Sequence, residues 1–280
     1  MKIAITAETT IDLSKELLKQ YDIHTVPLTV LLDDKMVLDG EVSNEEMFKF
    51  VEEKNMLPKT SAVNEEQYTK FFTEILKDYE AIIHISLSSE LSSACNNAKA
   101  ASEKFDNVYV IDSRTLSTGI ALEAIYANKL VKLGLKPEDI VSKVEAKIPF
   151  VQASFVLKKL NYLYKGGRCS ALSFFGANIL GIKPQIIVKN GKMDPYHKYR
   201  GPMEKVVREY CADTLKEFNT PDLDVAFLTY TSATEGMIME AEEALKKAGF
   251  KNIYKTTAGS TISSHCGENS LGILYINSNN

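Results

Sequence analysis

A serine-rich run is the segment of this chain best suited to binding or chemistry. The segment Ser86–Ser93 (SLSSELSS) follows a predicted buried strand, Ala81–Ser86, and is expected to open a helix over Leu91–Lys104. Open α/β sheets bind ligands at the carboxyl ends of their strands, and a helix N-terminus favours an anion. Ser92 and Ser93 would add hydroxyl donors for a carboxylate or phosphate. The alternative is that these serines only cap the helix, because serine is a favoured N-cap residue.

Two further segments offer polar side chains. His265 lies in Gly259–Gly267, where six of nine residues are Gly, Ser or Thr, so the backbone is expected to bend freely. A histidine there can donate to an oxyanion or act as a base, or it can bond only to local backbone. Thr60 and Ser61 lie in a predicted loop just before a helix. They are therefore candidates either for ligand binding or for capping that helix.

Two arginines are candidates for pairing with an anionic ligand. Arg168 follows a predicted short helix, Leu157–Lys165, which Gly166-Gly167 closes. Arg200 follows a predicted hairpin. The planar guanidinium suits two-pronged contact with a carboxylate or phosphate. The alternative is that both are ordinary solvated surface residues.

The first half of the chain alternates strand and helix patterns. Asp12 is expected to cap a helix that reaches Gln20, and Ser43 with Glu46 has the spacing of a capping box. Strand patterns occupy four segments: Ile3–Thr6, His24–Leu32, Ala81–Ser86 and Val108–Asp112. Long helices are expected from about Glu65 to Lys77 and over Leu116–Leu133. This alternation predicts a parallel sheet with helices on its faces.

The second half has a different pattern. Asn190-Gly191 predicts a tight hairpin between Ile182–Lys189 and the residues that follow. Helices are predicted at Met203–Glu217 and Glu235–Ala248, and strands at Val225–Thr229, Asn252–Thr257 and Leu271–Ile276. We therefore predict an α/β protein of two domains. Residues 1–150 form the domain with the parallel sheet flanked by helices, residues 151–280 form an α+β domain, and a ligand pocket lies between them.

Composition and missing motifs exclude several functions. Lys+Arg 33 against Asp+Glu 37 gives a net charge of −4, and no basic run suggests nucleic acid as a partner. No apolar stretch reaches the ~18 residues that cross a bilayer, so no stable membrane insertion is expected. There is no nucleophile elbow, phosphate loop or strand-linked GxGxxG, and no histidine pair with HxxxH spacing. We expect neither a metal nor a cofactor.

The four cysteines indicate where the protein resides. Cys95, Cys169, Cys211 and Cys266 are widely spaced and form no CxxC motif. They are interpreted as free, inert thiols in a reducing compartment, which predicts a cytoplasmic protein.

Taken together, these segments resemble the DegV family in order and spacing across nearly the whole chain. The matching pieces are Lys59-Thr60-Ser61, Ser86–Ser93, Val110–Arg114, Leu163–Arg168, Gly181–Pro184 with the Asn190-Gly191 hairpin, Arg200, and Ala258–Gly267. Departures occur beside these pieces, as at Thr6–Thr10, Ser93-Ala94 and His265-Cys266-Gly267. They leave Thr60, Ser92 and His265 in place.

The resemblance implies a protein that binds one long-chain fatty acid. In the family, residues matching Thr60 and Ser92 bind the carboxylate, and the histidine matching His265 belongs to the same polar cluster. Members of known role present the acyl group to a separate fatty acid kinase, so such a kinase is an implied partner. Arg168 and Arg200 match arginines near the pocket mouth. The implied role is that of a binding protein without catalytic residues.

Three alternatives remain open from the sequence. An acyl hydrolase would use Ser92 as nucleophile and His265 as base, with an orienting acid. A phosphate or nucleotide module would use the serine-rich helix start. A DegV fold could also hold another lipid acid. Five aromatic residues could line a pocket or belong to a plain core: Tyr126, Phe150, Phe155, Phe174 and Phe175.

Overall fold

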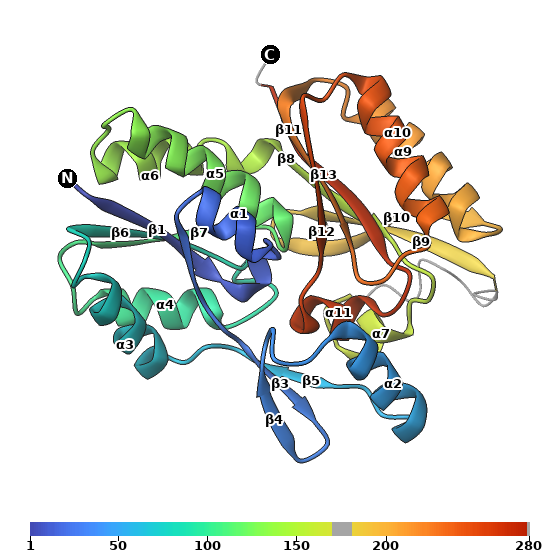
Figure 1. The fold of residues 1–280 in the computed structure, drawn as a ribbon, viewed down its shortest axis with the longest axis horizontal. Coiled ribbons are helices and arrows are strands. Elements are labelled where there is room, and N and C mark those ends of the chain that lie inside the picture. The colour runs from blue at the N-terminus through green and yellow to red at the C-terminus, as the bar shows by residue number, and fades with distance from the viewer. Residues whose placement is uncertain (170–180, 279–280) are drawn as a thin grey trace.

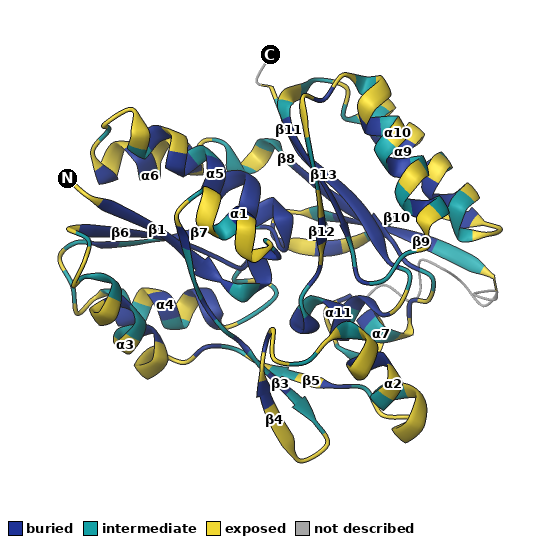
Figure 2. Ribbon diagram, in the orientation of Figure 1, coloured by how far each residue is buried: buried dark blue, intermediate teal, exposed yellow. Residues whose placement is uncertain are grey.

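The computed structural model describes residues 1–169 and 181–278, and its strands form three sheets (Figure 1). The first sheet has four parallel strands in the order β2-β1-β6-β7. Their bounds are β1 Ile3–Glu8, β2 Ile23–Val26, β6 Ala81–Ser86 and β7 Val108–Asp112. The central strands β1 and β6 are buried along their whole length, as expected for a parallel sheet covered on both faces (Figure 2).

Helices cover both faces of this parallel sheet. One face carries α5 (Thr118–Lys132), α6 (Pro137–Glu145) and the short α1 (Lys15–Gln20), and the other carries α3 (Glu65–Ile75) and α4 (Ala94–Ser102) (Figure 1). Helix α5 also contacts three strands of the second sheet. Because α5 lies between the two sheets, most of its residues are buried.

The second sheet is mixed and has six strands in the order β10-β9-β8-β13-β11-β12. Its bounds are β8 Val151–Val156, β9 Ile182–Lys189, β10 Lys192–Arg200, β11 Pro221–Tyr230, β12 Asn252–Thr257 and β13 Leu271–Asn277. Only β11 and β12 pair in parallel. Helices α9 (Met203–Glu217) and α10 (Glu235–Ala248) cover the face turned away from α5 (Figure 1). The predicted fold class, a helix-flanked parallel sheet followed by an α+β part, is confirmed.

A third, small sheet joins a segment of the first half of the chain to helix α11 near the C-terminus. Strands β3 (Thr29–Leu32), β4 (Lys35–Leu38) and β5 (Lys59–Ser61) pair antiparallel in the order β4-β3-β5. Helix α11 (Ser260–Cys266) packs on β3 and β5 and also contacts α2 (Asn44–Lys54) and α7 (Asn161–Lys165). Two 3-10 turns, η1 (Thr9–Ile11) and η2 (Ile148–Phe150), complete the described elements.

Several element boundaries differ from the sequence predictions. The expected helix start at Leu91 is wrong, because the amides of Leu91 and Ser92 bond to the Ser88 carbonyl in a turn and α4 begins only at Ala94. The expected loop at Lys59–Ser61 is a strand, because β3 supplies its pairing partners. The freely bending segment expected around His265 is helix α11.

Further differences concern the ends and the presence of elements. Helix α7 begins at Asn161 rather than Leu157, because the Leu157 amide continues the strand pairing by bonding to the Pro184 carbonyl. The sequence predicted no strand at β4 or β8 and no helix at α6. The capping box of Ser43 and Glu46 is confirmed.

No helix in the described ranges is long and apolar enough to cross a membrane. The domain division near residue 150 stays a prediction.

Candidate functional site

A cavity of about 240 Å³ collects six of the seven predicted site residues. Its walls come from the end of β5, the serine-rich loop after β6, the segment after α7, strand β10 and helix α11. The predicted residues that line it are Thr60, Ser61, Ser92, Ser93, Arg168 and His265. Ser61, Ser93 and Arg168 are exposed, so the cavity opens to solvent on their side.

The polar centre of this cavity is the pair formed by Thr60 and His265. Thr60 Oγ1 and His265 Nε2 lie 2.9 Å apart, although the residues are separated by 205 positions in the sequence. Burial, together with the nearby charge of Arg168, lowers the pKa of His265 to about 4. The imidazole is therefore neutral near pH 7 and has one N–H group to donate.

The serine-rich loop places two more hydroxyls at the cavity. Ser92 Oγ accepts a hydrogen bond from the Ala94 amide at 3.2 Å, which leaves its own hydroxyl proton available for a ligand. Ser93 is the N-cap residue of α4, but its side chain makes no capping hydrogen bond. The capping interpretation therefore explains Ser92 in part and does not explain Ser93.

The two arginines occupy different places. Arg168 donates from Nη1 to the Gly166 carbonyl at 2.6 Å and from Nε to the Leu91 carbonyl at 3.4 Å, so it joins the end of α7 to the serine-rich loop at the cavity rim. Arg200 is exposed at the end of β10 and is not among the residues that line the cavity.

Two buried aspartates hold helix α11, and with it His265. Asp39 accepts from Ser260 Oγ at 2.8 Å and from the Thr261 amide at 3.2 Å. Asp12 accepts from the Gly259 amide at 2.7 Å and from the Ser117 hydroxyl. The prediction that Asp12 caps the helix reaching Gln20 is wrong, because Ser14 caps that helix.

The close approach of both aspartates constrains position 259. A Cβ on Gly259 would lie 2.8 Å from Asp39 Oδ1 and 3.3 Å from Asp12 Oδ1, so a larger residue would push α11 away. Burial, with a smaller contribution from the charge of Asp39, raises the pKa of Asp12 to about 8. Sequence reasoning missed the role of both aspartates.

A second buried network supports the start of the serine-rich loop. Glu8 Oε1, at the end of β1, accepts from Tyr68 Oη at 2.5 Å and Ser86 Oγ at 2.6 Å, and lies 3.1 Å from His84 Nε2. Glu8 Oε2 accepts from the Leu87 amide at 2.9 Å. Burial alone would raise the pKa of Glu8, but His84 and the hydroxyl donors lower it to about 2.

An apolar cavity lies next to the polar one. The two share Leu116, Ile262 and Cys266, and the apolar cavity continues to the inner face of the six-stranded sheet. Its wall includes Phe155, Leu271 and Leu274. Of the other aromatic candidates, Phe174 and Phe175 lie outside the described residues. The arrangement suits an amphipathic ligand with its polar end near the opening.

The described residues of this site include neither an oriented histidine base nor a cluster of metal ligands. His265 Nδ1 has no hydrogen-bond partner among the described residues, so no acid orients the imidazole as a catalytic base requires. Within the described ranges, no group of three potential metal ligands occurs. The four cysteines are buried and form no disulfide within the described ranges, and burial raises the pKa of Cys266 to about 12.

Known proteins share the whole of this architecture. A "DegV domain-containing protein" of Caldanaerobacter subterraneus subsp. tengcongensis is 30% identical over 98% of both chains. A "Fatty acid-binding protein" of Thermotoga maritima is 28% identical over 97% of this chain and 96% of its own. The crystal structure of DegV from Bacillus subtilis, described as a fatty acid binding protein, superposes with a TM-score of 0.86 at 28% identity, covering 99% of this chain and 100% of that one.

The fold and the site define an α/β protein with a cavity that is polar at its opening and apolar behind. A family model described as "Uncharacterised protein, DegV family" matches residues 2–278. With that match and the 30% identity to a full-length relative, the chain belongs to the DegV family.

Proposed function

We propose that this protein binds one long-chain fatty acid between the domains formed by residues 1–150 and 151–280. The observation that carries the proposal is the polar cavity around Thr60, Ser92 and His265, with the apolar cavity directly behind it. Relatives named or described as fatty acid-binding proteins support it. Four cysteines that form no disulfide in the described part of the chain fit a cytoplasmic location.

The acyl tail would supply most of the affinity. Burying about 14 methylenes at roughly 0.8 kcal/mol each gives on the order of 11 kcal/mol before ordering costs. The tail would pass Leu116 and Ile262, which both cavities share, and reach the inner face of the six-stranded sheet.

The carboxylate would be held where the cavity opens. A buried carboxylate is costly unless it is hydrogen-bonded. The hydroxyls of Thr60 and Ser92 and the N–H of His265 would offset that cost, and Arg168 adds positive charge at the rim. Because these groups are polar and uncharged apart from Arg168, they would fix which end of the ligand faces out without trapping it.

This orientation suits presentation of the ligand to a separate fatty acid kinase. The head group would lie beside the exposed Ser61, Ser93 and Arg168, where a second protein could reach it. Arg200 is also exposed, and we propose that it meets the kinase rather than the ligand. The protein itself would then act as a binding subunit without catalysing the transfer.

We expect Ser92→Ala to lose bound fatty acid. Losing a hydrogen bond to a charged group costs about 1.5–3 kcal/mol, which corresponds to an affinity about 10- to 150-fold lower. Occupancy would be measured by solvent extraction of the purified variant and mass spectrometry of the released lipid. Ser142→Ala is a matched control, because Ser142 is exposed on α6 and lines neither cavity. Equal fatty acid occupancy in both variants would show that Ser92 does not bind the ligand. A different lipid acid in the extract would show that the ligand is not a long-chain fatty acid.

A further inference from the structure

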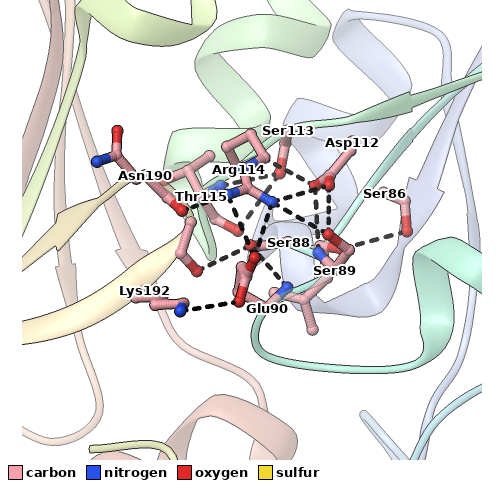
Figure 3. Close-up of polar contacts among 12 residues, drawn as sticks. Ser86, Ser88, Ser89, Glu90, Asp112, Ser113, Arg114, Thr115, Asn190 and Lys192 are labelled. Atoms are coloured by element: carbon pink, nitrogen blue, oxygen red, sulfur yellow. Dashed lines mark hydrogen bonds and ion pairs between the residues drawn. The ribbon is translucent and has the colours of Figure 1, made fainter.

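The motif Val110–Arg114 belongs to none of the functions assigned so far, yet it ends at a dense polar cluster (Figure 3). Arg114 follows β7 in a left-handed conformation, with φ 53°. Its guanidinium donates to the Asn190 carbonyl, to Ser89 Oγ at 3.2 Å and to Asp112 Oδ2 at 3.4 Å. One side chain therefore joins the tip of the β9–β10 hairpin to the serine-rich loop.

Asp112 fixes both the arginine and the loop. Its Oδ1 accepts from the amides of Ser89 and Arg114, each at 3.1 Å, and its Oδ2 accepts from Ser89 Oγ at 2.5 Å. Although burial alone would raise the pKa of Asp112, these hydrogen bonds and the charge of Arg114 lower it. The carboxylate is thus charged and can hold Arg114 in the orientation that reaches the hairpin.

Two further contacts hold the hairpin tip. The buried Ser88 donates from Oγ to the Gly191 carbonyl at 2.8 Å, and Lys192 Nζ lies 3.4 Å from Glu90 Oε2 (Figure 3). Position 191 requires glycine: its φ is +81°, and a Cβ there would lie 2.5 Å from Ser88 Oγ and 2.9 Å from Arg114 Cζ. We call this arrangement the latch: Ser88 and Arg114 bond to the hairpin tip, and Ser89 and Asp112 hold Arg114 in place.

The latch joins two walls of the proposed ligand cavity. Leu91 and Ser92 follow Ser88 and Ser89 in the same loop, with Glu90 between them, and Met193 comes two residues after Gly191. The amides of Leu91 and Ser92 both bond to the Ser88 carbonyl, so the latch residue Ser88 also sets the position of Ser92. Released from the latch, the two walls would be free to separate.

There is space beside the latch for such a movement. A cleft of about 710 Å³ borders it, and Arg114, Thr115 and Asn190 form part of the cleft wall. This cleft shares Ala153 and Val188 with the apolar cavity. The hairpin tip therefore lies between the ligand cavities and an open volume.

We propose that Arg114 is a positioning residue for the ligand site: it latches the hairpin tip to the loop that carries Ser92 and so slows escape of the bound acyl chain. The choice of ligand rests on the proposed function, but the latch itself does not. Lysine would replace the arginine poorly, because only the guanidinium fork reaches the hairpin carbonyl and the loop together.

Two measurements on Arg114→Ala, Arg114→Lys and the control Arg208→Ala test this proposal. Arg208 pairs with Glu240 on the outer helices α9 and α10, away from both cavities. In the ligand-free protein, hydrogen exchange of residues 87–93 and 188–194 should speed up in Arg114→Ala and stay unchanged in the control. The dissociation rate of the fluorescent fatty acid parinaric acid should rise about tenfold or more in Arg114→Ala, and by less in Arg114→Lys.

The outcomes separate the latch from the proposed function. Faster exchange together with an unchanged dissociation rate would overturn the positioning role. If the unmodified protein binds no fatty acid, the proposed function fails. Unchanged hydrogen exchange in Arg114→Ala would overturn the latch, whether or not the protein binds fatty acid. Should Arg114→Ala not fold, Gly191→Ala, which displaces the tip by steric contact, must show the same faster exchange at the loop.

Discussion

A fatty acid of about eight carbons is expected to bind more weakly than one of about sixteen, by as much as about 6 kcal/mol, because roughly 0.8 kcal/mol is lost with each methylene. In the proposed binding mode the tail would enter the apolar cavity, whose walls include Phe155, Leu271 and Leu274. Ordering a longer chain costs some of this gain, so the figure is an upper value. Isothermal titration calorimetry with a series of saturated acids would measure the slope.

The matched control for chain length changes only the head group. The methyl ester of the same long acid keeps the whole tail but cannot present a carboxylate to Thr60 and His265. It should therefore bind more weakly than the acid while showing the same dependence on length. An affinity that does not change between eight and sixteen carbons would mean that the tail lies outside the protein.

Replacing Glu8 by alanine is expected to lower the free energy of unfolding by about 3–5 kcal/mol, because each buried donor left without an acceptor costs about 1–3 kcal/mol. The variant would leave His84, Tyr68, Ser86 and the Leu87 amide buried without their shared acceptor. Urea unfolding followed by circular dichroism would measure the loss. Glu240→Ala is the matched control, because its pairing with Arg208 is at the surface and should contribute less than about 1 kcal/mol.

The same network predicts a pH dependence with a definite sign. The pKa of Glu8 is lowered to about 2 from the ordinary value of 4.5. Its contribution to stability is therefore complete above about pH 4.5 and is lost as the pH falls toward 2. The free energy of unfolding of Glu8→Ala should depend less on pH across that range than that of the unmodified protein. The same pH dependence in both proteins would show that the Glu8 carboxylate does not stabilise the fold.

The sequence predicted most of the elements because their patterns are local. Strands β6, β7 and β12 and helices α9 and α10 have the predicted bounds, since apolar periodicity and capping residues lie within each segment. Strand β5 was missed because its three residues are too few to show an alternating apolar pattern. Its strand structure comes from pairing with β3.

The site was predictable in part for the same reason. Ser92, Thr60 and His265 each have a local context that predicts polar contact, but only the tertiary fold brings Thr60 within 2.9 Å of His265. Aspartate is usually a surface residue, and nothing in the sequence around Asp12 and Asp39 indicates that both are buried. For Glu8 a signal existed: it ends a buried apolar strand at the edge of the sheet where ligands bind.

The central claim is that this protein encloses a long-chain fatty acid. Its most direct test is to extract the purified recombinant protein with organic solvent and to identify the released molecules by mass spectrometry, with the amount compared to protein concentration. We predict one long-chain fatty acid per chain. An empty extract, with no uptake of added fatty acid afterwards, would contradict the claim.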